Sequence, residues 1–430
     1  MIKEKIALKI ELVLLVSGNE KFDRILCFKI FIPFGLAYFL SVLLGSANSI
    51  MSPILIETFA LSPTDLGFMS SVYLAAFGIA QFPVGVLLDL YGGRETLIPL
   101  LILAVIGTLI FAGAESYAML VISKIFLGIG MAGCLMAAFK TFSQWMPAKK
   151  LPLLYSFQSL TGGIGGMFAT RPLAYAFEII EWRYIFIFLA ILTFVTLVLL
   201  YLLVPKSNLN IKRTSNTEII KSFRAMLSFC IESRFWMVAP VIITSQAVMF
   251  SYLYLWVGPW MRDVAKFDEI AVGMYMLYAF TGAALGYFLN GIIADLSIKT
   301  KMFSMEKLYL IFGAGLTIFL GIIMTKNDSS ASFFWVLVMF FANMTMIAFP
   351  IMQKFYASSE VGRALSLLNF TIFLMSFIFQ WFIGVVLDFY PVVDGRFSAE
   401  GYQTSLAVIV VLNMAAVTHL YFELRKRRII

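Results

Sequence analysis

The sequence has few charged residues and few residues that serve metal or redox chemistry. Asp, Glu, Lys and Arg make up 13% of its 430 residues, whereas soluble domains carry about 25%. His419 is the only histidine, and the three cysteines lack metal-ligand or redox spacing. No nucleophile–base set and no phosphate-binding glycine loop after a strand is present. We therefore expect no enzyme activity, no metal site, no cofactor and no disulfide framework.

Long apolar runs take the place of these features, and 61% of the residues are hydrophobic. Twelve runs are each long enough to cross a bilayer as a helix. They do not alternate apolar and polar residues, which favours helices over the strands of a barrel. The expected limits are 30–55, 65–89, 96–114, 118–141, 153–177, 184–204, 235–258, 271–294, 307–325, 333–353, 365–388 and 402–422.

The longest polar interruption among the runs, residues 205–234, predicts two bundles of six helices, 30–204 and 235–422. Most of the 32 Lys and Arg residues lie outside the runs, in this linker, in the tails 1–29 and 423–430, and in the loops on the same side. Basic residues collect on the cytoplasmic side of membrane proteins. We expect a bacterial cytoplasmic-membrane protein with both termini inside, and the net charge of +8 does not indicate a nucleic-acid partner.

Two similar glycine–aspartate stretches end the second and eighth runs. The first runs from Gly85 through Asp89 to Glu95, and the second from Gly291 to Asp295. Because they fall at the same place in each half, they indicate an internal duplication, as in many transporters.

The first stretch resembles a signature of the major facilitator superfamily, Gly-x-Leu-x-Asp-Arg-x-Gly-x-Arg-Arg. Leu90 and Glu95 depart from that pattern, and five residues match it: Gly85, Leu87, Asp89, Gly92 and Arg94. The resemblance implies an all-α membrane fold of twelve helices in two pseudo-symmetric bundles. It also implies a monomer in the lipid bilayer that moves a small solute by rocking its halves about a central site.

The superfamily resemblance gives these stretches a gating role. A carboxylate is stabilised by the free N–H groups at a helix N-terminus. We expect Asp89 to accept such groups at the start of the eleventh run, after Gly362, and Asp295 to do so near Leu154. The alternative is that each aspartate only caps its own loop. The predicted gating residues are Gly85, Asp89, Gly92, Arg94, Gly291 and Asp295.

Basic residues inside predicted spans need a partner or a way to reach the interface. Lys140 is close to the inner end of the fourth run, and we expect it to be a boundary anchor. Lys124 stands in the fourth run in a Lys-x-x-x-Gly-x-Gly pattern, similar to a superfamily motif that has Arg at this position. We expect it to bind an anionic solute, although it could instead extend to the outer interface. Arg171 could join it, or pair with Glu178 or Glu181.

Neutral polar residues at mid-span depth are candidates for hydrogen bonds to the solute, with Tyr252 and Tyr254 as amphipathic walls. Each could equally bond the backbone of a neighbouring helix. The five candidates are Asn48, Gln158, Gln246, Asn343 and Asn369.

These observations predict a secondary transporter of a small polar solute, an organic anion rather than a cation, with uptake slightly favoured. No acidic residue lies in the middle of a predicted span, so the coupling ion, proton or sodium, stays open. The alternatives are an exporter of metabolites, siderophores or drugs, and a sensor that binds solute without moving it.

Overall fold

The computed structural model describes residues 24–206, 228–300, 304–326, 328–357, 360–393 and 395–427. The side chains of residues 24, 294–295 and 298–300 also lie outside the description. Across the described residues the chain is helical, apart from one isolated β-bridge between Val393 and Arg396. The all-α fold predicted from the sequence is confirmed.

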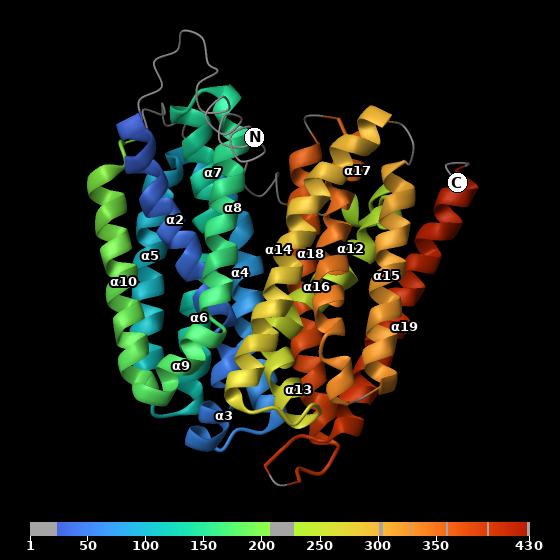
Figure 1. The fold of residues 1–430 in the computed structure, drawn as a ribbon. Coiled ribbons are helices and arrows are strands. Elements are labelled where there is room, and N and C mark those ends of the chain that lie inside the picture. The colour runs from blue at the N-terminus through green and yellow to red at the C-terminus, as the bar shows by residue number, and fades with distance from the viewer. Residues whose placement is uncertain are drawn as a thin grey trace, which may run out of the picture.

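The chain forms two bundles that stand side by side (Figure 1). The N-half consists of α2 (Arg24–Ser46), α3 (Asn48–Phe59), α4 (Pro63–Tyr91), α5 (Gly93–Ala112), α6 (Tyr117–Met131), α7 (Cys134–Trp145), η1 (Ala148–Lys150), α8 (Leu151–Phe168), α9 (Arg171–Ile179) and α10 (Trp182–Leu203). The C-half consists of η2 (Ser228–Ile231), α12 (Ser233–Ser251), the π-helix η3 (Tyr252–Trp256), α13 (Val257–Asp263), α14 (Glu269–Thr300), α15 (Met305–Lys326), η4 (Ser329–Ala331), α16 (Phe334–Met344), η5 (Thr345–Ile347), α17 (Ala348–Phe355), α18 (Val361–Asp388) and α19 (Ala399–Lys426).

Eleven helical segments of the described chain are long and apolar enough to cross a membrane. Helices α8 and α9 supply the twelfth crossing, where several glycines make the sequence less apolar. Two predicted boundaries fall inside helices, because α2 already begins at Arg24 and α19 continues to Lys426. Most of the predicted linker and N-terminal tail lies outside the described residues.

Breaks occur at matching places in the two halves. The first span is interrupted at Ala47, between α2 and α3, and the seventh by the π-helix η3. The fourth span is interrupted between α6 and α7, and the tenth by the 3-10 turn η5. Short π and 3-10 pieces inside helices often mark functional hinges. The repeated positions support an internal duplication in which the first and fourth helix of each half can bend.

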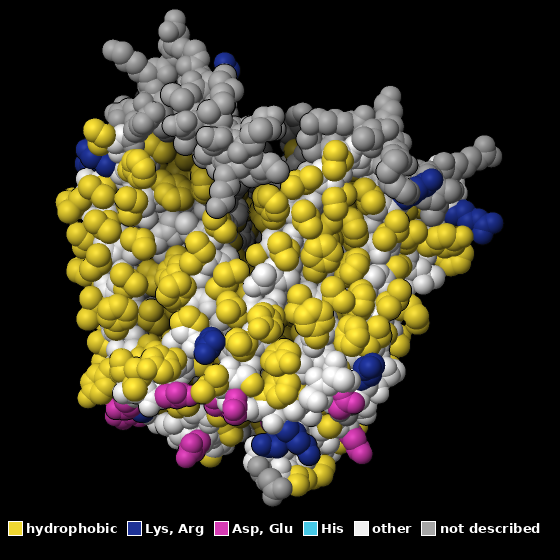
Figure 2. Space-filling model, in the orientation of Figure 1, with side chains coloured by type: hydrophobic (Ala, Val, Ile, Leu, Met, Phe, Trp, Pro, Cys, Tyr) yellow, Lys and Arg dark blue, Asp and Glu magenta, His cyan; other side chains and the backbone are white. Residues whose placement is uncertain are grey.

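The start of α2 and the end of α19 lie at the same end of the molecule, which we call the termini end (Figure 1). On the face in Figure 2, hydrophobic side chains form a band between the two ends, and the described Asp and Glu side chains gather at the opposite end. Large hydrophobic side chains such as Phe188, Ile318 and Phe422 are exposed. A belt of exposed apolar side chains is expected where helices face lipid.

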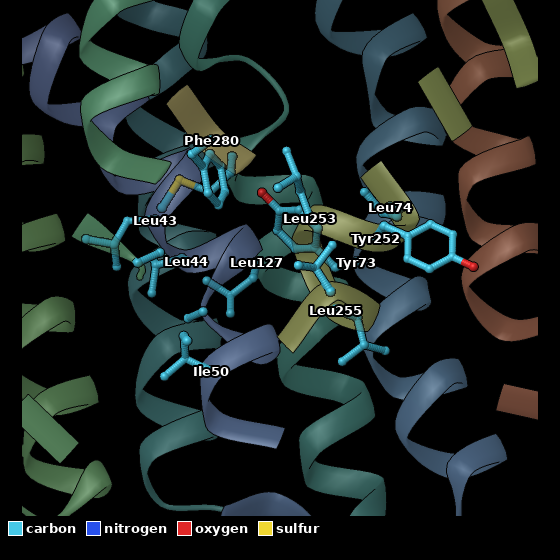
Figure 3. Close-up of a cluster of buried hydrophobic side chains, with 14 of the residues drawn as sticks. Leu43, Leu44, Ile50, Tyr73, Leu74, Leu127, Tyr252, Leu253, Leu255 and Phe280 are labelled. Carbon is cyan, nitrogen blue, oxygen red and sulfur yellow. The ribbon is translucent and has the colours of Figure 1, made fainter. Parts of the chain in front are cut away.

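The two halves share one hydrophobic core in the middle of the molecule. Leu44 and Tyr73 of the N-half and Leu253 and Phe280 of the C-half lie in the same buried cluster (Figure 3). A second buried cluster, from Phe229 to Leu424, belongs to the C-half alone. The halves are therefore joined through the first cluster.

Contacts at the opposite end bring the two backbones very close. A Cβ atom on Gly258 would collide with the carbonyl oxygen of Ser49, and one on Gly384 would collide with that of Pro63. Only glycine permits this approach. At the termini end a cavity of about 420 Å³ separates α4 and α7 of the N-half from α18 of the C-half. The molecule is thus closed at the opposite end and open at the termini end.

Candidate functional site

Lys124 lies in a polar cluster inside the N-half. Its Nζ donates a hydrogen bond to Oδ1 of Asn48 at 2.7 Å, and Nδ2 of Asn48 donates to Oγ of Ser70 at 2.8 Å. The Phe111 ring covers the ammonium at 4.2 Å from its centroid. The break at Ala47 makes Asn48 the first residue of α3, so α3, α4, α5 and α6 all contribute to the cluster. The structure thus brings together two residues that the sequence proposed for solute binding.

The charge of Lys124 has no acidic partner in the part of the chain that the structure describes. Its side chain is 1% exposed, and its hydrogen bond goes to a neutral amide. An ammonium group has three donors, and an unpaired charge within the membrane is expensive. The aromatic ring provides partial compensation of the cation–π kind. The alternative that the sequence left open, extension of Lys124 to the outer interface, is not seen, because the side chain is buried.

Three of the neutral candidates bond the backbone of helices in their own half. Nε2 of Gln158 donates to Phe34 O at 2.9 Å, and Nε2 of Gln246 donates to Ala342 O at 2.9 Å. Nδ2 of Asn343 donates to Met339 O at 3.1 Å. Gln158 and Gln246 thereby bond a neighbouring helix, which is the alternative that the sequence left open, whereas this Asn343 bond stays within α16. Oε1 of Gln158 and Oε1 of Gln246 have no hydrogen-bond partner among the described residues.

Arg171 does not join Lys124. It is exposed at the start of α9, where its Nη1 lies 3.5 Å from Sδ of Met274 in α14. Gly273 packs against the backbone of Arg171, so this part of the boundary between the halves is tight. The prediction of a basic pair is wrong for this conformation, because the fifth span breaks after Phe168 and Arg171 begins a separate short helix.

The predicted tyrosine walls lie in and next to the π-helix of the seventh span. Tyr252 is fully buried and stacks on Trp335, with 4.6 Å between ring centroids, inside the C-half. Tyr254 faces Tyr73 of the N-half at 6.4 Å. Of the two, only Tyr254 has this contact across the boundary between the halves.

Asn369, Gly85 and Asp89 line the cavity at the termini end. Asp89 Oδ1 accepts a hydrogen bond from Lys140 Nζ at 2.7 Å, within the N-half, and the Asp89 side chain is 78% exposed. The expected bond to the start of α18 is not formed in this conformation, because the cavity lies between α4 and α18.

The other predicted gating residues have local roles in the structure. Gly92 adopts a φ of 86° between α4 and α5, a conformation that favours glycine. Arg94 is buried and donates to Tyr201 O of α10 at 2.8 Å, which fixes α5 within the N-half. Gly291 has open space around its Cα. Asp295 lies inside α14 rather than at its end, and its side chain is outside the described part.

Arg262 in α13 is a residue that the sequence analysis missed. Its Nη2 donates to Ser49 O at 3.1 Å and to Ile50 O at 3.0 Å, and its Nη1 donates to Ser52 Oγ at 3.0 Å. All three acceptors belong to α3, in the other half. We call these three hydrogen bonds the Arg262 bridge. The available signal was Pro53, which cannot supply an N–H to the carbonyl of Ser49 four residues earlier.

With this geometry established, comparison with known proteins places the chain in a family. The family model described as Major Facilitator Superfamily matches residues 34–380, which is most of the chain. The chain belongs to the major facilitator superfamily. It is therefore a multi-pass membrane transporter of small molecules, as the hinge motif predicted, and its relatives are transporters rather than enzymes.

Similar superfamily members include one whose name states efflux and one whose name states no direction. The Hexuronate transporter of Escherichia coli (strain K12) is 22% identical over 386 residues, covering 84% of this chain and 86% of that protein. The Aspyridones efflux protein of Neocamarosporium betae is 28% identical over 166 residues, covering 37% of this chain. The chain spans only 29% of the length of that efflux protein.

A solved structure of another transporter has the same overall fold. It is the crystal structure of a bacterial homolog to the human lysosomal transporter Spinster, in an inward-facing and unoccupied conformation. The TM-score is 0.76 at 17% sequence identity, with 95% of this chain and 98% of that chain covered. The twelve-helix superfamily fold predicted from the sequence is thereby confirmed.

Proposed function

We propose that this superfamily member carries an organic anion of the sugar-acid class and that Lys124 contacts the anionic group. The buried ammonium, which has a neutral amide as its hydrogen-bond partner, carries this proposal. An anion would supply the countercharge, and Asn48, which bonds the lysine and Ser70, holds the ammonium in position. A hexuronate transporter aligns over 84% of this chain, which supports an acidic sugar as the solute.

We propose that the termini end lies in the cytoplasm of a bacterium and that the opposite end lies outside. The basic tails and linker support it, since cytoplasmic segments are enriched in Lys and Arg. The acidic side chains at the opposite end agree with this placement (Figure 2). In this frame the conformation described is closed to the outside and open to the cytoplasm.

Transport by alternating access would require the closed end to open and the open end to close. Asp89 then has two partners in turn: Lys140 when the inner side is open, and the start of α18 when that side closes. The matching breaks in the first, fourth, seventh and tenth spans supply places where helices can bend. We propose that the protein transports as a monomer and that a proton or a sodium ion is the coupling ion.

Uptake is the direction we propose. The hexuronate relative is matched over 86% of its length, and the efflux relative over 29%. Export of a metabolite is the second candidate, because that efflux protein matches part of the chain at higher identity. A sensor that binds without transporting would show solute binding and no counterflow in liposomes.

The substitution Lys124→Ala tests the anion contact, with Arg171→Ala as the matched control. A hydrogen bond to a charged group contributes about 1.5–3 kcal/mol, so the dissociation constant for a hexuronate should rise about tenfold or more. Arg171→Ala should leave it within about twofold, because that side chain is exposed. Binding is measured by titration of purified protein, with the matching neutral hexose as a competitor that should fail. Equal affinity in wild type and Lys124→Ala would refute the role of Lys124.

Uptake into proteoliposomes tests the direction and the substrate class. Labelled hexuronate should accumulate in liposomes that contain the protein. Uptake is measured with and without a pH gradient, and the two rates are compared. A protein that takes up neutral hexoses at the same rate as their acids is not an organic-anion transporter. A negative result for this substrate class would leave the superfamily membership and the contacts at the opposite end unaffected.

A further inference from the structure

We propose that Arg262 is the gate residue of the opposite end, and that the Arg262 bridge holds the two halves together there. This inference goes beyond the substrate proposal and does not depend on the identity of the solute. It follows from three features of the described residues: an available acceptor on α3, an arginine fixed in place by its own half, and a close backbone approach around them.

The sequence of α3 leaves one backbone carbonyl without its usual hydrogen-bond donor. The carbonyl of Ser49 would normally accept the N–H of residue 53, but Pro53 has none. A backbone carbonyl that is buried without a donor costs free energy. Nη2 of Arg262 donates to this carbonyl and to that of Ile50. The first turn of α3 therefore presents acceptors to the other half of the molecule.

The donor is fixed by an acidic residue of the C-half. Nε of Arg262 donates to Oε1 of Glu269 in α14, and the Arg262 side chain is only 13% exposed. Because the guanidinium is planar and presents five N–H groups in a fixed arrangement, Nη1 and Nη2 remain free for α3. A lysine at this position could not bond Glu269 and three acceptors of α3 at once.

The surroundings of the bridge exclude water and add one further bond. The backbone N–H of Gly258 donates to Ser49 Oγ at 2.9 Å, and Ser49 Oγ lies 3.4 Å from Sδ of Met276. Ser49 and Ser52 are completely buried. Opening the opposite end requires these bonds to break together, since all of them join α3 to the C-half.

A matched control residue is present at the same end. Arg183, at the start of α10, also bonds a carboxylate and a backbone carbonyl, those of Glu181 and Ala114. All three residues belong to the N-half, so Arg183 does not join the halves through these bonds. Arg183→Ala removes an arginine with similar partners and leaves the bridge intact.

The experiment measures the separation of the two halves at the opposite end. Spin labels are attached to Glu115→Cys in the N-half and Ser329→Cys in the C-half, both exposed, after Cys27, Cys134 and Cys230 are replaced. Distances are measured by double electron–electron resonance in lipid nanodiscs without solute. Wild type and Arg183→Ala should give one short-distance population. Arg262→Ala should raise the ratio of the long-distance to the short-distance population at least about tenfold, as expected for the loss of one or more charged hydrogen bonds.

Two further variants keep the test decisive. Glu269→Ala leaves Arg262 in place without its anchor and should give a smaller increase of the same kind. Arg262→Gln keeps an amide donor and should fall between wild type and Arg262→Ala. Size-exclusion elution confirms that each variant is folded. If folded Arg262→Ala and Glu269→Ala both give the wild-type distance distribution, Arg262 is not the gate residue.

Discussion

The two ends of the molecule use charged side chains in opposite ways. At the opposite end, Arg262 of the C-half bonds three groups of the N-half. At the termini end, Lys140 and Asp89 bond each other within the N-half, and a cavity separates them from α18. A polar contact that joins the halves stabilises one conformation of the cycle. A contact within one half does not hold the halves together, so its loss costs this conformation little. We expect substitutions at contacts between the halves to have the largest effects on transport, and Asp89 to act mainly through the partner proposed for the closed inner side.

The largest effect is expected from the close approach between the halves at Gly258. A single added methyl group would collide with Ser49 O. Overpacking of this kind costs about 1–3 kcal/mol, so Gly258→Ala should reduce initial uptake at least about fivefold. Gly163→Ala is the matched control, because a Cβ on Gly163 meets no atom within 4 Å. If both variants transport at the same rate, the opposite end does not need this close approach.

An intermediate effect is expected from Asp89→Asn at the termini end. The bond to Lys140 is exposed, and exposed ion pairs contribute about 0–1 kcal/mol, so solute binding and thermal stability should be nearly unchanged. The maximal transport rate should nevertheless fall several-fold, because the asparagine is a weaker acceptor when the inner side closes on α18. Lys140→Ala serves as the comparison, since it removes only the bond seen in this conformation. A full wild-type rate in Asp89→Asn would remove Asp89 from the gate.

The sequence was sufficient for the fold because its evidence is distributed over many residues. Twelve apolar runs, a central polar interruption and a repeated hinge each tolerate errors of a few residues. Lys124 and Asn48 could each be named as candidates, because polar groups inside spans have few possible roles, although their hydrogen bond to each other was not predicted. These predictions depend on composition and order along the chain, which the sequence states directly.

The remaining differences have separate local causes. Arg171 could join Lys124 or pair with Glu178 or Glu181 as judged from the sequence, but the chain breaks after Phe168 and Arg171 begins a separate helix. Asp295 was expected at a helix end, but α14 continues to Thr300. Arg262 was missed because its partners are mainly backbone carbonyls, which no side-chain motif identifies. Pro53 was the one local indication, and its meaning depends on which helix of the other half approaches it.

The smallest effect is expected from the buried amides that act within one half. Gln246 bonds Ala342 O inside the C-half and leaves its own Oε1 without a partner among the described residues. Methionine has a similar length and no polar group that needs a partner. Interhelical hydrogen bonds of this kind contribute about 0.6 kcal/mol on average, so Gln246→Met should change the affinity for a hexuronate by less than about twofold to threefold. Asn48→Ala, titrated in parallel, should weaken binding more, because Asn48 bonds Lys124 directly. A larger loss in Gln246→Met than in Asn48→Ala would move the solute site from the N-half cluster to the boundary between the halves.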